Sequence, residues 1–202
     1  MFNADWLDEP SRASRRIIFA RHGEYKCNLL GVCNCDPRIP YDLTEKGQQQ
    51  ALALGESLRH EGIEMIVTSE FLRARQTAWL ANKALRLPIV VNSFANENRV
   101  GSALEGKLTE VFLESISDDP ARTAAHDGES FLDLKGRIAR LMHDLARSSP
   151  KTILVVSHGW PLQAARVLQG LIDDDAAAMC VDMPGNCKMI RGVFSEGRFA
   201  PG

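Results

Sequence analysis

Short apolar runs that alternate with longer amphipathic segments constrain the fold of this chain more than any other feature. The apolar runs have the length of β-strands and are too short for helices. They span residues 17–20, 63–67, 89–91 and 152–156, and a last strand over 189–194 precedes a predicted reversal at 196–197. Helical periodicity occupies the stretches between the runs. This alternation predicts an α/β fold with a mainly parallel central sheet, covered on both faces as a three-layer α/β/α sandwich.

Residues with defined roles at helix ends indicate where the helices begin and stop. Thr44 can cap a helix that Gly62 stops, and Ser130 and Asp133 have the spacing of a capping box. Pro161 suits the first position of a helix. The predicted helices therefore run from Thr44 to Gly62, over 74–85 and 109–116, from Ser130 to 145, and onward from Pro161.

The length of the chain limits its organisation. Its 202 residues have room for one domain, which we place at residues 15–202. Residues 1–14 lack periodicity and are expected to form a flexible leader. Their acidic residues stand where a signal peptide has positive charge, so we expect a cytoplasmic protein.

The charge balance restricts the binding partners. The chain has 24 Lys and Arg residues against 26 Asp and Glu residues, a net charge of −2, so it offers no general basic field to nucleic acid or anionic lipid. No apolar run is long enough to span a bilayer. We therefore expect a small-molecule partner, and neither nucleic acid nor a membrane. The oligomeric state does not follow from the sequence.

Three of the five cysteines cluster, which raises the question of a metal site. Cys27, Cys33 and Cys35 lie close together in the sequence, whereas Cys180 and Cys187 come much later. Because no second cysteine pair or nearby histidine completes a zinc-binding set, we expect reduced thiols and no metal.

Two other features have more than one reading. The three consecutive acids at residues 173–175 would diverge around a helical turn, so we expect a solvated loop there rather than a metal site. Trp160 adjoins His158 and is compatible either with the mouth of a pocket or with packing on its own helix.

Residues suited to phosphate chemistry follow three of the predicted strands. The first strand leads into Arg21-His22-Gly23, and the fourth leads into Ser157-His158-Gly159. The second leads into Ser69, with Arg73 one turn into the next helix. Ligands of parallel α/β sheets bind beyond the carboxyl ends of the strands, so these residues are expected to converge on one crevice.

These residue types fit phosphoryl transfer. A neutral imidazole is a nucleophile near pH 7, and its attack on phosphorus gives a phosphohistidine that water can hydrolyse. Arginine binds phosphate oxygens in a two-pronged fashion and keeps its charge. The helix start after His158 supplies further anion stabilisation, and Gly159 allows the backbone to approach the phosphate closely.

A longer set of motifs resembles the histidine phosphatase superfamily, most closely its phosphoglycerate-mutase-like branch. The motifs are Arg21-His22-Gly23-Glu24 with Asn28, Leu43-Thr44 with Gly47, Ser69 with Arg73-Ala74, Gly128-Glu129-Ser130 and Ser157-His158-Gly159. They occur in family order between about residue 15 and residue 194. The resemblance implies a phosphoglycerate-mutase-like fold and a reaction that needs neither a metal nor an organic cofactor.

The resemblance also implies roles for individual residues. His22 would be the phosphorylated nucleophile. Arg21, Arg73 and His158 would form the phosphate pocket, and Asn28 would assist them.

The family's proton donor is an acidic residue after the third strand, and Glu97 occupies that stretch. An acid is needed because the leaving alkoxide must be protonated and the attacking water deprotonated. Glu97 and Gly101 keep the family spacing, but residues 102–106 contain one extra residue and no aromatic group. Glu105 is therefore the main alternative, and Glu24 is a third.

Two further departures concern the substrate. Tyr25 replaces a small hydroxyl residue that is common after Arg-His-Gly-Glu, and residues 29–41 differ from the usual form. In the family this segment lines the substrate entrance, so we do not infer the substrate of this chain from those of its relatives.

The leading hypothesis is a phosphatase that hydrolyses phosphate monoesters through a phosphohistidine on His22. The alternatives are a bisphosphoglycerate-dependent phosphoglycerate mutase and a catalytically weak phosphate-binding module. Mutases of the family carry an added segment that closes over the site. Residues 106–128 leave room for only a short helix here, which favours hydrolysis.

Overall fold

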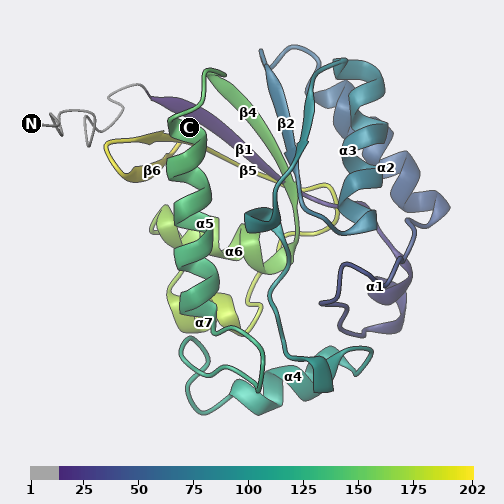
Figure 1. Ribbon diagram of the computed structural model, residues 1–202, viewed down its shortest axis with the longest axis vertical. Coiled ribbons are helices and arrows are strands. Elements are labelled where there is room, and N and C mark those ends of the chain that lie inside the picture. Colours follow the sequence, from purple (N-terminus) through teal and green to yellow (C-terminus); the bar gives the residue numbers. More distant parts are fainter. Residues whose placement is uncertain (1–13) are drawn as a thin grey trace, which may run out of the picture.

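A six-stranded sheet forms the centre of the computed structural model, which describes residues 14–202 (Figure 1). Apart from Ser14, the predicted leader lies outside the described residues. The strands are β1 (Arg15–Arg21), β2 (Met65–Thr68), β3 (Ile89–Val91), β4 (Thr152–Ser157), β5 (Met189–Ser195) and β6 (Arg198–Pro201). Their order is β3-β2-β4-β1-β5-β6. The first four strands run parallel, and β5 and β6 are antiparallel to their neighbours. The predicted mainly parallel sheet is confirmed.

Helices cover both faces of this sheet. They are α1 (Lys26–Leu30), α2 (Glu45–Ser57), α3 (Leu72–Leu85), α4 (Thr109–Ile116), α5 (Phe131–Ala146), α6 (Gly159–Leu168) and α7 (Asp174–Ala178). Two short 3₁₀ helices, η1 (Ser93–Ala95) and η2 (Ser102–Leu104), follow β3. In Figure 1, α2 and α3 lie on one side of the sheet and α5 and α6 on the other, which confirms the three layers.

The side chains of β1 point alternately to the two faces of the sheet, which explains why helices must cover both faces. Ile17 and Phe19 pack into the core formed with α5 and α6. Ile18 and Ala20 pack into the core formed with α2 and α3. All four are fully buried. Successive side chains of a strand point to opposite faces, so an uninterrupted apolar run requires a layer on each side.

Two strand and helix boundaries differ from the predictions by two residues. The second strand begins at Met65, two residues later than expected. Helix α6 begins at Gly159, so Pro161 is its third residue and His158 is its N-cap. The caps at Thr44 and Ser130 form as predicted, and the Ser130 capping box with Asp133 is complete.

The acidic run was wrongly predicted as a solvated loop. Asp173 caps the short helix α7 by accepting a hydrogen bond from the Ala176 N–H at 2.8 Å. Asp174 forms an ion pair with Lys135 on α5, at 2.6 Å. Asp173 therefore stabilises the start of α7, and Asp174 ties that helix to α5.

The edge strand β3 is exposed, with 36–52% of each residue accessible to solvent.

Among the helices of residues 14–202, none is both long enough and apolar enough to cross a membrane.

Candidate active site

Three buried polar side chains meet at the carboxyl end of the sheet. Strands β1 and β4 are neighbours, and the His22 N–H continues their ladder by donating to the Ser157 carbonyl at 2.9 Å. The rings of His22 and His158 lie with centroids 5.1 Å apart. Arg73, on the first turn of α3 after β2, places its Nε 3.3 Å from His22 Nε2. None of the three side-chain residues is more than 2% exposed.

Hydrogen bonds fix the tautomer of His22. Its Nδ1 lies 2.8 Å from the Gly23 carbonyl oxygen. A carbonyl oxygen only accepts, so the proton is assigned to Nδ1 and Nε2 keeps its lone pair. Burial, followed by the charges of Arg73 and Arg21, holds the pKa of His22 well below its usual value. At neutral pH this imidazole is an uncharged nucleophile, and its unprotonated Nε2 accepts a hydrogen bond from Arg73 Nε at the site.

The loop that carries His22 is seated by two glycines in close contact. A Cβ on Gly23 would lie 2.4 Å from the Gly47 carbonyl oxygen, and one on Gly47 would lie 2.0 Å from the Glu24 carbonyl oxygen. The Gly23 N–H donates to the Thr77 hydroxyl on α3 at 2.9 Å. The turn after β1 therefore rests directly on the start of α2 and the side of α3.

Arg73 is buried without a carboxylate partner among the described residues. Its guanidinium lies between the rings of Tyr25 and Phe71, 4.4 and 4.3 Å from their centroids. Its Nη1 donates to Asn34 Oδ1 at 2.5 Å, and its Nη2 donates to the Asn34 carbonyl at 3.2 Å. Burial lowers its pKa. These partners orient the guanidinium but leave its charge uncompensated, which suits a site for an anion.

Two more nitrogen atoms at the site have unused hydrogen-bonding capacity. Arg21 donates from Nη1 to the Pro184 carbonyl at 2.6 Å, whereas its buried Nε has no partner within residues 14–202. His158 has its Nε2 2.7 Å from the Ser69 hydroxyl, and its buried Nδ1 likewise has no partner there. Buried polar atoms without partners are rare, so both atoms point to a ligand.

Glu97 lies in the same cavity. Its carboxylate accepts a hydrogen bond from the backbone N–H of Asn98 at 3.0 Å. Burial raises the pKa of Glu97, and the charges of Arg73 and Arg21 oppose that rise. A carboxyl group with a raised pKa can both donate and accept a proton near neutral pH.

A buried ion pair holds the segment that carries Glu97. Arg137 on α5 pairs with the buried Glu129 and also donates to the carbonyl oxygens of three residues that precede or include Glu97. These carbonyl bonds go to Phe94 at 2.7 Å, Asn96 at 2.9 Å and Glu97 at 3.2 Å. The Gly128-Glu129-Ser130 motif therefore acts in part by positioning the acid segment.

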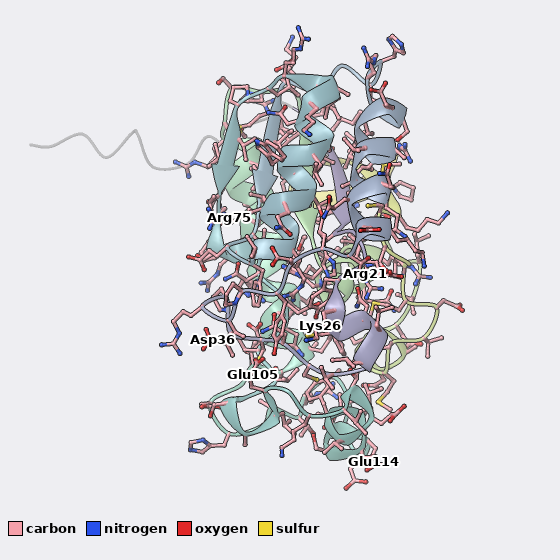
Figure 2. All side chains as sticks on the ribbon, turned by 90° about the vertical axis from the view of Figure 1, so that its right-hand side faces the viewer. Arg21, Lys26, Asp36, Arg75, Glu105 and Glu114 are labelled. Atoms are coloured by element: carbon pink, nitrogen blue, oxygen red, sulfur yellow. The ribbon has the colours of Figure 1, made fainter. Side chains whose placement is uncertain are left out.

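The two alternative acids lie outside the cavity lining and have structural partners. Glu105 accepts from Asn34 Nδ2 at 3.0 Å and from the backbone N–H groups of Cys35 and Asp36, at 2.7 and 3.1 Å. Figure 2 shows it beside Asp36 and apart from Arg21. Glu24 pairs with Lys46 at 2.7 Å. Of the three candidate acids, only Glu97 lines the cavity.

Asn28 belongs to a small amide network that the sequence did not predict. Asn186, in the loop before β5, donates from Nδ2 to the His22 carbonyl at 3.0 Å and to Asn28 Oδ1 at 3.1 Å. Sequence reasoning missed Asn186, Asn34 and Phe71. Asn34 and Asn186 lie in loops away from the strand ends, whereas Phe71 stands between Ser69 and Arg73 as the N-cap of α3. Nothing in the local sequence pattern marks any of the three.

The cavity between these groups measures about 220 Å³. Arg21, His22, Asn28, Arg73 and Glu97 are the predicted site residues that line it. The other two, His158 and Gly159, lie fully buried beside it: His158 against His22, and Gly159 where a Cβ would lie 2.6 Å from Met183 Sδ.

Of the two alternatives for Trp160, the structure supports the position at the cavity, and its packing partners lie on α4 and α7 rather than on its own helix α6. It lines the cavity, donates from Nε1 to the Ala178 carbonyl at 3.2 Å, and packs edge-on against Phe112.

The cysteines remain single thiols in the structure. All five are free, and within the described part of the chain no group of three or more His, Cys, Asp or Glu residues is arranged to hold a metal ion. Four of them, Cys27, Cys33, Cys35 and Cys180, line the cavity. Burial raises the pKa of each, for Cys35 and Cys180 to about 12, so these thiols are neutral.

Comparisons with known proteins agree with this geometry. A family model described as the histidine phosphatase superfamily (branch 1) matches residues 17–200. The chain is 32% identical over 150 residues to the adenosylcobalamin/alpha-ribazole phosphatase of Salmonella typhimurium, a match that covers 71% of this chain and 73% of that protein. It is 27% identical over 190 residues to the 2,3-bisphosphoglycerate-dependent phosphoglycerate mutase of Bartonella bacilliformis, covering 80% and 84% respectively.

The fold agrees as well. A solved structure of phosphoglycerate mutase from Bacillus anthracis superimposes with a TM-score of 0.76 at 18% identity, over 96% of this chain and 94% of that one. The predicted phosphoglycerate-mutase-like fold is confirmed.

Proposed function

The chain belongs to the histidine phosphatase superfamily, and on that premise we propose that it hydrolyses phosphate monoesters of small molecules through a phosphohistidine on His22. Phosphatase activity is supported at the level of the family by relatives that carry that name. The roles of individual residues rest on the site geometry.

One observation carries the proposal. His22 has its proton on Nδ1 and its unprotonated Nε2 at a cavity that Arg21 also lines. Within residues 14–202, the buried Nε of Arg21 and the buried Nδ1 of His158, which lies beside the cavity, have no partner. A nucleophile with an anion-binding surround is the arrangement that phosphoryl transfer requires, because the transferred group carries charge on three oxygens.

In the first step, Arg21, Arg73 and His158 hold the phosphate, and Asn28 assists. His22 Nε2 attacks phosphorus, a new N–P bond forms, and the bond from phosphorus to the alcohol oxygen breaks. Glu97, with its raised pKa, donates its proton to the departing oxygen. The products of this step are a free alcohol, phosphohistidine and the Glu97 carboxylate.

In the second step, water attacks the phosphorus of the phosphohistidine. The Glu97 carboxylate accepts a proton from that water, the N–P bond breaks, and its electron pair returns to Nε2. Inorganic phosphate leaves, and the enzyme regains its starting state. Glycine at position 159 leaves room for Met183, because a Cβ there would lie 2.6 Å from Met183 Sδ and would displace it.

Hydrolysis is favoured over mutase chemistry by the short segment between β3 and α5. Between Gly106 and Gly128 the chain forms one eight-residue helix, α4. A mutase must keep water away from the phosphohistidine until the phosphoryl group returns to a bound acceptor. An added closing segment serves that purpose, and this stretch supplies little chain for one.

Trapping of the intermediate tests the proposal. Phosphate-labelled substrate and a rapid quench that preserves acid-labile phosphate should place the label on His22. His22→Ala should lower turnover of 4-nitrophenyl phosphate by about 10⁴-fold or more. His60→Ala, at an exposed histidine beyond α2, is the matched control and should leave turnover unchanged. Label on Ser69 or on a cysteine would contradict the assignment of His22 as the nucleophile.

We further infer that residues 15–202 act as one domain in the cytoplasm. Support comes from the sheet, which joins β1 near the start to β6 at the end, and from five thiols that are all unpaired. Finding the protein in an oxidising compartment would contradict the second part of this inference.

A further inference from the structure

Beyond the phosphate-binding groups, the part of the cavity wall formed by residues 14–202 carries no positive charge. Among the described residues that line the cavity, Arg21 and Arg73 are the only permanent cations, and both are assigned to the phosphate. The only carboxyl group is Glu97, which has the role of the acid. A second phosphate or a carboxylate on the substrate would therefore lose its hydration without gaining a partner.

The rest of the wall is mainly apolar. It contains Val32, Cys33, Val100, Trp160, Cys180 and Met183. The two thiols are uncharged, since burial raises the pKa of both. Carbon and sulfur surfaces of this kind favour an apolar group on the ligand.

One polar side chain in this wall lacks a partner. Asn98 is 2% exposed, and its buried Oδ1 accepts no hydrogen bond from residues 14–202. It follows Glu97 directly, and its backbone N–H holds the Glu97 carboxylate. Asn34, by contrast, is fully engaged by Arg73 and Glu105. An amide at this position demands a complementary polar group on the ligand, next to the bond that breaks.

We propose that the substrate is a phosphate monoester of an uncharged alcohol, whose carbon skeleton is mainly apolar and carries a neutral hydroxyl that hydrogen-bonds to the Asn98 side chain. This rests on the proposed function, which supplies the phosphate site. Acids such as phosphoglycerates, and sugars with two phosphates, are thereby disfavoured.

Three synthetic esters with the same carbon chain test the charge requirement. They are hexyl phosphate, 2-hydroxyhexyl phosphate and the phosphate ester of 6-hydroxyhexanoate. We expect kcat/KM for the carboxylate ester to be about 100-fold lower than for hexyl phosphate, because the buried carboxylate has no partner. A difference of less than tenfold overturns the proposal.

A charge placed in the wall should change this preference. Val32→Lys adds a cation at a half-buried lining position and should reduce the discrimination against the carboxylate at least tenfold. Leu29→Lys is the matched control: it makes the same change of charge on a neighbouring residue that is 67% exposed and does not line the cavity. An equal effect of the two variants counts against the proposal.

Asn98→Ala tests the hydroxyl contact. The native enzyme should prefer 2-hydroxyhexyl phosphate over hexyl phosphate by about tenfold, and the variant should lose this preference while it still hydrolyses hexyl phosphate. Retained turnover of hexyl phosphate shows that the variant is folded. If the preference is absent in the native enzyme or survives in Asn98→Ala, the assignment to Asn98 is wrong.

Turnover of 4-nitrophenyl phosphate distinguishes failure of this substrate proposal from failure of the proposed phosphatase function. Without His22-dependent turnover of that ester, the proposed function itself fails. With such turnover and no discrimination against the carboxylate ester, only the substrate class fails.

Discussion

Two regions of the active site are built in different ways. The floor, defined by Arg21, His22, Arg73 and His158, is held by the register of neighbouring strands and by the first turns of α3 and α6. The wall, defined by Val32, Asn34, Asn98, Val100 and Trp160, comes from the segment between α1 and α2, from the stretch between η1 and η2, and from the second residue of α6.

This difference assigns the reacting groups to the floor and the choice of substrate to the wall. Backbone ladders place the two histidines of the floor, whereas the guanidinium of Arg73 also depends on its contacts with Asn34 in the wall. The wall depends on single side-chain contacts, such as Glu105 with the N–H groups of Cys35 and Asp36, and it is free to vary with the substrate. Substitutions in the floor should therefore affect every substrate, whereas those in the wall should change which substrate is preferred.

The largest effect in this series should follow from Glu97→Gln, and it should depend on the leaving group. An alkyl alkoxide must be protonated as it departs, so turnover of alkyl phosphates should fall by about 10³-fold. Nitrophenolate leaves without help, so kcat/KM for its ester should fall less than tenfold. The comparison uses kcat/KM for both esters, which reports the steps up to release of the alcohol, because the hydrolysis of phosphohistidine that also needs Glu97 is common to both. Equal losses in kcat/KM would remove Glu97 as the acid.

Arg73→Lys should lower kcat by about 10²-fold and raise KM much less. A lysine cannot hold the two contacts with Asn34 and also present a planar fork to the phosphate, and the lost contact is strongest in the transition state. Arg75→Lys, at an exposed position on the same helix, is the control (Figure 2). An unchanged kcat in a folded Arg73→Lys protein would show that Arg73 does not bind the transferred phosphate.

The pH profile should show a smaller effect, about tenfold, in the ratio of alkyl to aryl phosphate hydrolysis. Glu97 must be protonated for the first step, and its pKa is raised, so the ratio of kcat/KM should fall as pH increases through that pKa. His22 has a lowered pKa and stays neutral in mild acid, so the ratio should persist there. A rise of the ratio toward alkaline pH would contradict the assignment.

Glu105→Gln should have the smallest effect, less than threefold on kcat for either ester. An amide oxygen can still accept from the backbone N–H groups of Cys35 and Asp36, and no proton transfer is assigned to this side chain. If instead alkyl turnover falls and aryl turnover does not, Glu105 is the acid and the division between floor and wall fails at that point.

The sequence predicted the floor better than the wall, and the reason is physical. His22 and His158 follow apolar runs, and parallel strands bring their carboxyl ends together, so convergence follows from topology. Glu105 could not be distinguished from Glu97 in this way. Its partners lie about 70 positions earlier in the chain, and such pairings depend on loop paths that local patterns do not encode.

Helix boundaries show the same limit on a smaller scale. Capping pairs such as Ser130 with Asp133 act within four residues and were predicted correctly. The run at residues 173–175 was not, because Asp174 is held by Lys135 on another helix. Prediction from the sequence fails where the stabilising partner is remote.

The buried guanidinium between Tyr25 and Phe71 links ligand binding to the folding equilibrium. An uncompensated charge inside the protein raises the free energy of the empty native state relative to the unfolded chain, in which arginine is hydrated. An oxyanion that binds only the native state reverses this, by about 2.7 kcal/mol at a concentration one hundred times its Kd. Inorganic phosphate, the product of the proposed reaction, would then also act as a folding ligand for the enzyme that releases it.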